Sequence, residues 1–406
     1  MLKRNHLLWK RTPLQSRYDA VIIGGGVHGL SAAYFLSRRQ GMKNVAVLEK
    51  RHIGYGGSGR NTAIVRANQR TPENISLYAE GLKLWPRLTS ELNVNLMFFN
   101  CGVLTLAHSD SDLSDLRLAA ASGKFLGIEN KILDSRSCRE LVPALDISNR
   151  PRHPVIGGMF HPAGGTLRHD AVIWGLAKGA SRSGVHIHQE TEVTGIEIEG
   201  GSVKSVKTSR GSVQTPRVLI AAGAWSAGVA GMAGLDLPVR LMNAPAMVTQ
   251  PLKPFLDHVI SSGAYPCYAN QTLKGEVVAC GPLDSCPDIS TETATENLQR
   301  LAYALTDLLP CLTGVKMMRA WAGPVDVTPD MAPIIDGNDP IQGLFLDCGW
   351  GDFGFKSGPV VGKYMAQFMA EGKMPEKLSP FSLARFENYR LQGETPASDS
   401  YIPVKS

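Results

Sequence analysis

A glycine-rich turn near the amino terminus constrains the fold of this chain more than any other feature. A Gly-x-Gly-x-x-Gly motif at 24–29 lies between an apolar run at 18–23 and a segment rich in helix-forming residues at 30–36. A second apolar run follows at 44–49. Apart from Asp19, Asn44 and Glu49, both runs are apolar, as parallel strands covered on both faces are. The spacing therefore predicts a strand–helix–strand unit and an α/β fold.

The three glycines have separate roles in a dinucleotide-binding turn. Gly24 makes the tight turn, Gly26 lets backbone amides approach a pyrophosphate, and Gly29 lets the helix pack closely on the strand. Glu49 ends the second strand, where a carboxylate accepts hydrogen bonds from the adenosine ribose. The same acid disfavours a 2′-phosphate, so we do not expect NADP.

Later segments favour FAD over NAD. A second cluster of glycine and small polar residues occurs at 54–62, soon after the acid. Flavin enzymes need backbone and small polar groups there to hold the pyrophosphate and the ring edge, whereas NAD dehydrogenases continue into an ordinary helix. The predicted strand at 218–222 and the glycine-rich element at 349–358 would complete the FAD site.

Composition and charge narrow the class of protein. The length of 406 residues suggests two or three domains at about 100–200 residues each, and 43% hydrophobic and 19% charged residues are typical of a soluble globular protein. The seven cysteines are scattered without a C-x-x-C pair, which argues against disulfides and a cysteine zinc site, so we expect no metal and a reducing compartment. We see no signal peptide and no membrane span, and expect a cytoplasmic protein.

Positive charge is concentrated in the amino-terminal tail. The formal net charge is +6, and residues 1–17 contain five basic residues and no acid. The tail is too small a basic face for nucleic acid. It is either a loosely ordered end or a segment that docks on a partner subunit.

Several further motifs occur in a fixed order along the chain. They are VIIGGGVHGL at 21–30, VAVLEK at 45–50, Arg60-Asn61-Thr62 with Arg66, GTLRHD at 165–170, and CGWG at 348–351 with Gly354-Phe355-Lys356. Through these motifs the chain resembles the β subunits of heterotetrameric sarcosine oxidases, within the D-amino-acid oxidase-like flavoproteins. The resemblance runs from about residue 18 to beyond residue 385, and it is more specific for the family than for the substrate.

The resemblance implies a fold of the glutathione-reductase/D-amino-acid oxidase type. In this α/β fold an FAD-binding, Rossmann-like domain carries an inserted, mainly antiparallel-sheet substrate domain. After the tail at 1–17, we assign 18–85, 150–225 and 325–406 to the FAD-binding domain, and 86–149 and 226–324 to the substrate domain.

The resemblance to sarcosine oxidase β subunits also implies two flavins and several partner subunits. One flavin is noncovalent FAD, and the other is FMN linked covalently to a histidine at a subunit interface, the position that His169 matches. A neutral imidazole nitrogen can attack an oxidised 8α-carbon. From the residues alone, a single histidine after a Gly-Thr turn is more often a helix-cap or surface residue. The implied partners are a large α subunit and, in the fullest assembly, small γ and δ subunits.

Four residues are candidates for the chemistry. Arg66 and Lys356 are expected near the substrate carboxylate, and Lys356 also suits the flavin edge where negative charge develops. The alternative for Arg66 is a structural ion pair, and the alternative for Lys356 is a side chain exposed to solvent. Tyr268 and Lys274 precede the strand-like run 276–279, at positions that line the substrate cavity or lie over the flavin in relatives; a structural role is the alternative.

The expected cofactor-binding residues come from every glycine-rich segment. They are Gly24, Gly26, His28, Gly29, Glu49, Lys50, Ser58, Arg60, Asn61, Thr62, His169, Val193, Gly223, Gly351, Gly354 and Lys356.

Departures from the family pattern lie around the expected flavin and substrate. A Gly-Ser-Gly triplet at 57–59 replaces bulkier polar residues, 261–270 contains no histidine, and Trp225 replaces a small or polar residue. We therefore expect oxidation of a secondary amino acid such as sarcosine, by hydride transfer to FAD and electron transfer to FMN. N-methylglutamate, proline or an opine are alternative substrates. A dehydrogenase with an acceptor other than oxygen, a single-flavin amine oxidase and a non-enzymatic flavin-binding scaffold are alternative classes.

Overall fold

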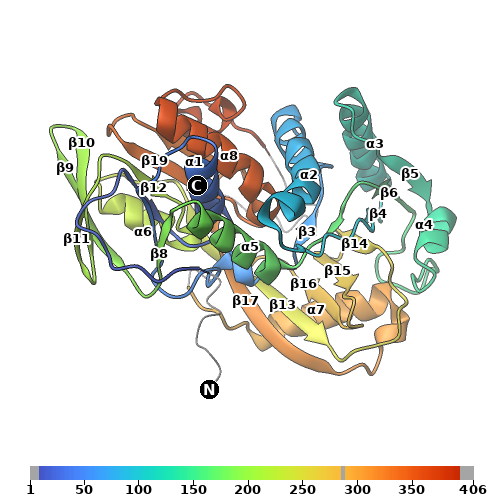
Figure 1. Cartoon of the computed structure of the whole chain (residues 1–406). Helices are drawn as coiled ribbons and strands as arrows, with labels where there is room; N and C mark the ends of the chain where they lie inside the picture. Colours follow the sequence, from blue (N-terminus) through green and yellow to red (C-terminus); the bar gives the residue numbers. More distant parts are fainter. Residues whose placement is uncertain (1–8, 285–288, 394–406) are drawn as a thin grey trace, which may run out of the picture.

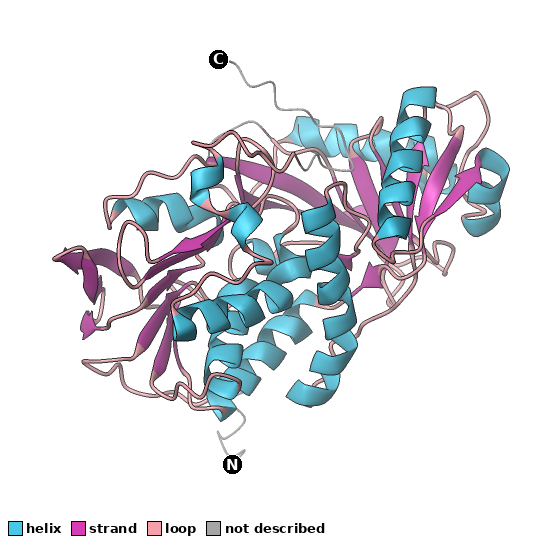
Figure 2. Cartoon of the chain, turned by 90° about the horizontal axis from the view of Figure 1, so that it is seen from above, coloured by secondary structure: helices cyan, strands magenta, loops and turns pink. Residues whose placement is uncertain are grey.

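The computed structural model describes residues 9–284 and 289–393. The described strands form two large sheets, one of six strands and one of eight. Figure 1 shows them toward opposite ends of the molecule. Seen from above in Figure 2, helices gather between the strands of the two ends. Part of the basic tail, including Lys3 and Arg4, lies outside the described residues.

The six-stranded sheet forms around the predicted strand–helix–strand unit. Its order is β18 (Ile334–Gly337), β19 (Leu344–Cys348), β12 (Val218–Ile220), β1 (Ala20–Ile23), β2 (Val45–Leu48) and β8 (His186–His188). All neighbours are parallel except β18 and β19. The chain passes from β1 to β2 on one side and returns to β12 on the other. The carboxyl ends of these strands therefore meet where the strand order reverses, which is where open α/β sheets bind ligands.

Successive residues of β1 face two different layers. Ala20 and Ile22 pack in a core with four helices, whereas Val21 and Ile23 pack in a core with a three-stranded sheet. The helices are α1 (Val27–Arg38), α2 (Pro72–Leu92), α5 (His169–Arg182) and α8 (Gly354–Glu371), and the strands are β9 (Val193–Glu199), β10 (Ser202–Thr208) and β11 (Gly211–Gln214). Because both faces are covered, β1 is apolar at every position, as predicted.

Helices α1 and α8 touch through glycines. A Cβ added at Gly358 would lie 2.6 Å from a methyl group of Val27, and one added at Gly362 would lie 2.4 Å from Cβ of Ser31. Helix α8 begins at Gly354, well before residue 360, where sequence alone predicts its start. Glycines and Pro359 have low helix propensity, but the glycines are required for this close contact, so tertiary packing overrides propensity.

The eight-stranded sheet is mainly antiparallel, and with the first sheet it confirms the predicted fold class. Its order is β17 (Met317–Val327), β13 (Arg240–Thr249), β16 (Val277–Cys280), β15 (Cys267–Gln271), β14 (Val259–Ser262), β4 (Val103–Ala107), β6 (Gly157–His161) and β5 (Lys131–Asp134). The pair of β14 and β4 is parallel. Strand β6 pairs with β4 and β5, although it comes from the segment 150–225 that we assigned to the FAD-binding domain.

Further helices and strands surround the two large sheets. Helices α3 (Asp110–Phe125), α4 (Ser135–Leu141) and α7 (Thr295–Leu308) accompany the eight-stranded sheet, α6 (Ser226–Gly231) follows β12, and β3 (Ile64–Val65) pairs with β7 (Gly165–Thr166). Among the described helices, none combines the length and the apolar character that a membrane span needs.

Candidate active site

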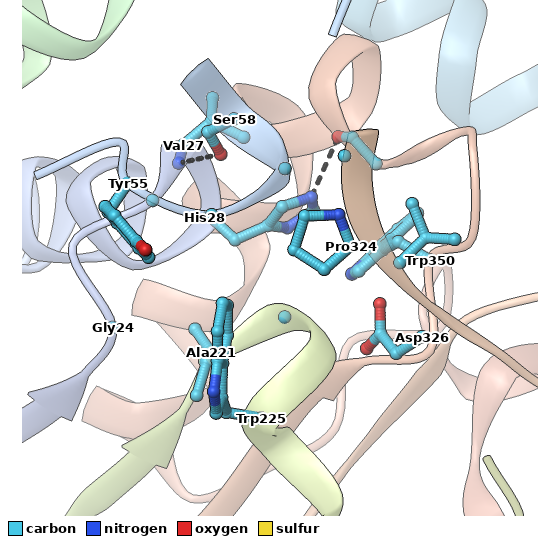
Figure 3. A pocket seen from close by; sticks show the side chains of 18 of the residues that line it. Gly24, Val27, His28, Tyr55, Ser58, Ala221, Trp225, Pro324, Asp326 and Trp350 are labelled. Carbon is cyan, nitrogen blue, oxygen red and sulfur yellow. Dashed lines mark hydrogen bonds between the residues drawn. The ribbon is translucent and has the colours of Figure 1, made fainter. Parts of the chain in front are cut away.

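A cavity of about 560 Å³ opens at the carboxyl ends of β1, β2 and β12. Ile23, Leu48 and Ala221 line it at the strand ends. Figure 3 shows the side chains of Tyr55 and Trp225 on one side of this space and those of His28, Trp350 and Asp326 on the other. Its size and position match those of ligand sites in α/β proteins.

The glycines of the first turn leave no room for side chains. Gly24 has a φ of +114°, and a Cβ there would lie 2.2 Å from the carbonyl oxygen of Ala221. A Cβ at Gly29 would lie 2.1 Å from the carbonyl oxygen of Gly24. The backbone at Gly26 borders the cavity, and the Val27 N–H donates to Ser58 Oγ at 3.0 Å (Figure 3). The positive end of helix α1 thus borders the cavity, where the Ser58 hydroxyl accepts one of its N–H groups.

Glu49 is held rigidly at the edge of the same cavity. Its two oxygens accept N–H groups of Gly25 and Arg51, each at 2.8 Å. Burial raises the pKa of this carboxyl, and the two backbone donors oppose that rise. Carboxylate oxygens have further lone pairs, so Glu49 can still accept ribose hydroxyls. The neighbouring Lys50 pairs with Glu192 at 2.6 Å.

His28 forms a buried charged cluster in the cavity wall. Its Nδ1 lies 3.0 Å from the Asp347 carboxylate, and its Nε2 lies 2.8 Å from the carbonyl oxygen of Gly354. Because both ring nitrogens face acceptors, the geometry favours two N–H groups and hence the imidazolium form. Burial works to lower the pKa of His28, but Asp347, Gly354 and Asp326 raise it above its ordinary value. Trp350 stacks on the imidazole at 4.5 Å between ring centroids.

Asp326 brings a second carboxylate to this wall. It is 3% exposed, and burial raises its pKa to about 6 against the hydrogen bond from the Gly349 N–H. Sequence analysis missed Asp326 because an acid within a long strand carries no local motif. It also missed Tyr55, although that residue lies inside the glycine-rich cluster at 54–62.

The cavity fits a flavin dinucleotide. An acid suited to a ribose, a helix terminus suited to a pyrophosphate, and aromatic rings on facing sides occur along one continuous space. Trp225 lies on one side, and His28 and Trp350 lie on the other. Twelve of the predicted cofactor-binding residues line it: Gly24, Gly26, His28, Glu49, Lys50, Ser58, Arg60, Asn61, Val193, Gly223, Gly351 and Gly354. Gly29 lies beneath the turn, and Thr62 and Lys356 line a neighbouring cavity.

This second cavity, of about 50 Å³, brings together three of the four residues predicted to carry the chemistry. Arg66, Tyr268 and Lys356 all line it, and Tyr268 and Asp352 line both cavities, so the two spaces adjoin. Arg66 comes from the segment after β3, Tyr268 from β15 and Lys356 from the first turn of α8. No local pattern predicts this meeting, since it depends on how the two sheets are placed.

The cations of the second cavity are held by carbonyl groups and aromatic rings. Arg66 Nη1 donates to the main-chain and side-chain oxygens of Asn68, each at 3.0 Å. Lys356 is 8% exposed; its Nζ donates to the carbonyl oxygen of Asp352 at 3.2 Å and lies 4.8 Å from the Phe353 ring centroid. Burial raises the pKa of the Tyr268 phenol well above its usual value, so this group stays protonated.

Two predicted residues lie away from both cavities. Lys274 is exposed in the turn between β15 and β16. His169 is the first residue of α5 and is half-buried; burial lowers its pKa, opposed by Asp170. The roles assigned to these two residues stay predictions.

These features define a flavin-binding α/β protein with two adjoining cavities. Residues 19–368 match the family described as FAD dependent oxidoreductase. The chain belongs to this family: it is an FAD-dependent oxidoreductase.

Individual relatives confirm the narrower resemblance. The chain is 40% identical over 379 residues to sarcosine oxidase subunit beta of Rhizobium meliloti, covering 93% of this chain and 91% of the relative. It is 37% identical over 390 residues to the protein of the same name from Rhodobacter capsulatus, covering 96% and 94%. A crystal structure of L-proline dehydrogenase from P. horikoshii superposes with a TM-score of 0.87 at 28% identity, covering 93% of this chain and all of that one.

Proposed function

We propose that this protein oxidises a secondary α-amino acid such as sarcosine, as the catalytic subunit of a multi-subunit complex. The name shared by the bacterial relatives supports the substrate class and the complex. The observation that carries the proposal is the placement of Arg66 and Lys356 on one small cavity that adjoins the dinucleotide cavity.

In this proposal, the chain's own residues bind and orient the substrate. Arg66 and Lys356 bind its carboxylate, because a guanidinium and an ammonium in a small, partly apolar cavity form strong charge-assisted hydrogen bonds. Phe353 and Phe355 are buried and keep water from this space. The substrate nitrogen then faces the larger cavity through the opening that Tyr268 lines.

Bound FAD would supply the redox chemistry, accepting a hydride from the carbon attached to nitrogen once the nitrogen has lost its extra proton and is a neutral amine. The protein's contribution is positional and electrostatic. The buried Lys356 ammonium in the second cavity favours negative charge that develops on a bound ligand. The Tyr268 phenol keeps its proton across the physiological range, so it acts as a hydrogen-bond donor and not as a base.

An anaerobic spectral screen tests the proposed function. The purified holoprotein is mixed without oxygen with sarcosine, proline, N-methylglutamate and an opine, and flavin absorbance is followed. We expect at least one of these secondary amino acids to bleach the flavin, and the matched primary amino acid to bleach it more slowly. If none of them bleaches the flavin, the proposed function is wrong and the scaffold alternative gains support.

A second candidate is a proline-directed dehydrogenase that uses an acceptor other than oxygen. The close superposition with an L-proline dehydrogenase favours it. Fast bleaching by proline, fast reduction of a dye and slow formation of hydrogen peroxide would support this candidate. Fast peroxide formation with sarcosine would exclude it.

We also propose that His169 carries a covalent FMN at a subunit interface. Its lowered pKa leaves the imidazole neutral and nucleophilic at neutral pH. It lies outside both cavities described above, so a second flavin there would not compete with FAD. On the same helix, Trp174 is 47% exposed and offers apolar surface for a partner subunit.

The flavin content of the purified complex tests this second flavin. After acid precipitation, we expect yellow colour to stay with the protein and a tryptic peptide containing His169 to carry the mass of FMN. His169→Ala should release all flavin on precipitation. Complete release from the wild-type protein would instead support a single-flavin amine oxidase.

A further inference from the structure

The second cavity contains an acidic residue that the proposed function leaves without a task. Asp352 precedes helix α8 and lines both cavities. Its charge acts on the residues opposite. After burial, it is the strongest influence that raises the pKa values of Tyr268 and Cys280. Its Oδ1 atom is buried, so this oxygen does not face solvent.

One oxygen of Asp352 lacks a partner within the cavity. Across residues 9–284 and 289–393, no group is placed to hydrogen-bond its buried Oδ1. Lys356 Nζ approaches this residue at the main-chain carbonyl oxygen, at 3.2 Å. Leaving a charged acceptor buried and unsatisfied is costly, since it loses water without gaining a donor. A ligand that brings a donor to this oxygen would remove that cost.

The charges of the small cavity form a pattern of two cations and one anion. Arg66 and Lys356 are complementary to a carboxylate, and Asp352 is complementary to a cationic donor. A zwitterionic amino acid presents both charges a short distance apart. A secondary ammonium group also has two N–H bonds, so one can point to Asp352 while the nitrogen keeps its place in the cavity.

We propose that Asp352 Oδ1 accepts a hydrogen bond from the substrate's ammonium group and thereby selects zwitterionic amino acids over carboxylates of the same shape that lack the nitrogen. This inference rests on the proposed function, because it takes the small cavity as the amino-acid site. Asp352 is a specificity-determining residue in this scheme. It distinguishes an N–H from a CH₂ at one position, which a purely apolar wall does poorly.

A pair of matched ligands tests this role. Sarcosine and butanoate differ by NH₂⁺ against CH₂, as do proline and cyclopentanecarboxylate; the pair is chosen to match whichever amino acid bleaches the wild-type holoprotein. The dissociation constant of the amino acid comes from the concentration dependence of anaerobic flavin reduction. That of the carboxylic acid comes from its competitive inhibition.

In Asp352→Asn, we expect the amino acid to bind about tenfold to hundredfold more weakly, as expected for loss of a hydrogen bond between charged groups. The affinity of the matched carboxylate should change by less than about threefold. Asp352→Ser serves as a second variant if the Asn protein fails to fold. Asp257→Asn removes one charge at an exposed site outside both cavities, and it should change neither constant.

The outcomes separate the two proposals. Equal weakening of both ligands, or of neither, overturns the assignment of Asp352 while the proposed function stands. Loss of FAD from the folded Asn protein also overturns it, because Oδ1 would then serve the cofactor. If no amino acid bleaches the wild-type protein, the proposed function fails first and this inference fails with it.

Discussion

His28 and Asp347 form an ion pair inside the cofactor cavity wall, with 3.0 Å between Nδ1 and the carboxylate. The side chain of Asp347 is fully buried, and that of His28 is 10% exposed. The acid also accepts the indole N–H of Trp350 at 2.7 Å. A cation within the dinucleotide motif is thus fixed between a carboxylate, a carbonyl group and an aromatic ring.

We predict that His28→Gln destabilises the cofactor-free protein by about 3–5 kcal/mol at pH 6, because it leaves Asp347 without its cation. The folded pKa of His28 is raised, so its stabilisation is complete below the unfolded value of about 6.5 and is lost as pH rises through the folded pKa. Urea unfolding across pH 5.5–9 measures the difference between variant and wild type. That difference should shrink toward alkaline pH. His52→Gln, at an exposed position, is the control, and a pH-independent difference would contradict the prediction.

Gly29→Ala should abolish FAD retention. The added methyl would lie 2.1 Å from the carbonyl oxygen of Gly24, so the helix must move away from the turn that holds the pyrophosphate. We expect overpacking to cost about 1–3 kcal/mol or more and the purified protein to be colourless. Gly231→Ala has open space around its Cβ and should keep its flavin. A yellow Gly29→Ala protein with wild-type stability would show that the turn is more adaptable than we argue.

Lys356→Met should lower the rate constant for anaerobic flavin reduction by about 10²-fold or more, because it removes a preorganised cation from a buried site. Substrate affinity should fall as well, since the carboxylate loses one of its two cations. Lys363→Met provides the comparison, as Lys363 lies on the same helix but is 46% exposed and pairs with Glu80. Unchanged reduction in Lys356→Met would remove this lysine from the mechanism.

Asp330→Asn should lower the free energy of unfolding by about 3–5 kcal/mol at pH 7. Arg385 binds this carboxylate through two hydrogen bonds of 2.8 and 2.9 Å, and both side chains are at most 2% exposed. Burial works to raise the pKa of Asp330, but Arg385 holds it below its ordinary value.

The pH dependence of this loss has a defined sign. A lowered pKa stabilises the fold above the unfolded value of about 3.9, and this contribution disappears as pH falls through the folded pKa. The difference between Asp330→Asn and wild type in urea unfolding should therefore narrow below about pH 4. Asp146→Asn, which breaks the more exposed pair with Arg150, should change stability little. Equal losses at the two sites would mean that burial does not matter here.

Local patterns in the sequence predicted the cofactor half of the molecule well. The unit from residue 18 to 49 combines apolar runs, glycines and an acid within a short stretch, and strand ends fix where such residues meet. Most of the predicted cofactor-binding residues therefore line one cavity. The fold class followed from the same features and from the family resemblance.

The substrate side was harder to predict because its residues come from distant parts of the chain. Arg66, Tyr268 and Lys356 meet only after both sheets are placed. Asp352 was missed because the glycine-rich element at 349–358 predicts backbone contacts with a cofactor and gives no signal for an acidic side chain. Lys274 lies in an exposed hairpin turn away from both cavities, and its role stays a prediction. The sequence predicted too late a start for α8, because the glycines in its first turns have low helix propensity. They are required there for close contact with α1.

The glycine contact between α1 and α8 acts as a fixed spacer. One helix begins at the cofactor cavity and the other carries Lys356 into the small cavity, and no side chain separates them at Gly358 and Gly362. A relative that acquired a larger residue at either position would have to move the two helices apart. That change would also increase the distance between Lys356 and the dinucleotide cavity. Changes in substrate preference during evolution are therefore expected in the eight-stranded sheet and at Asp352, while this spacing is kept.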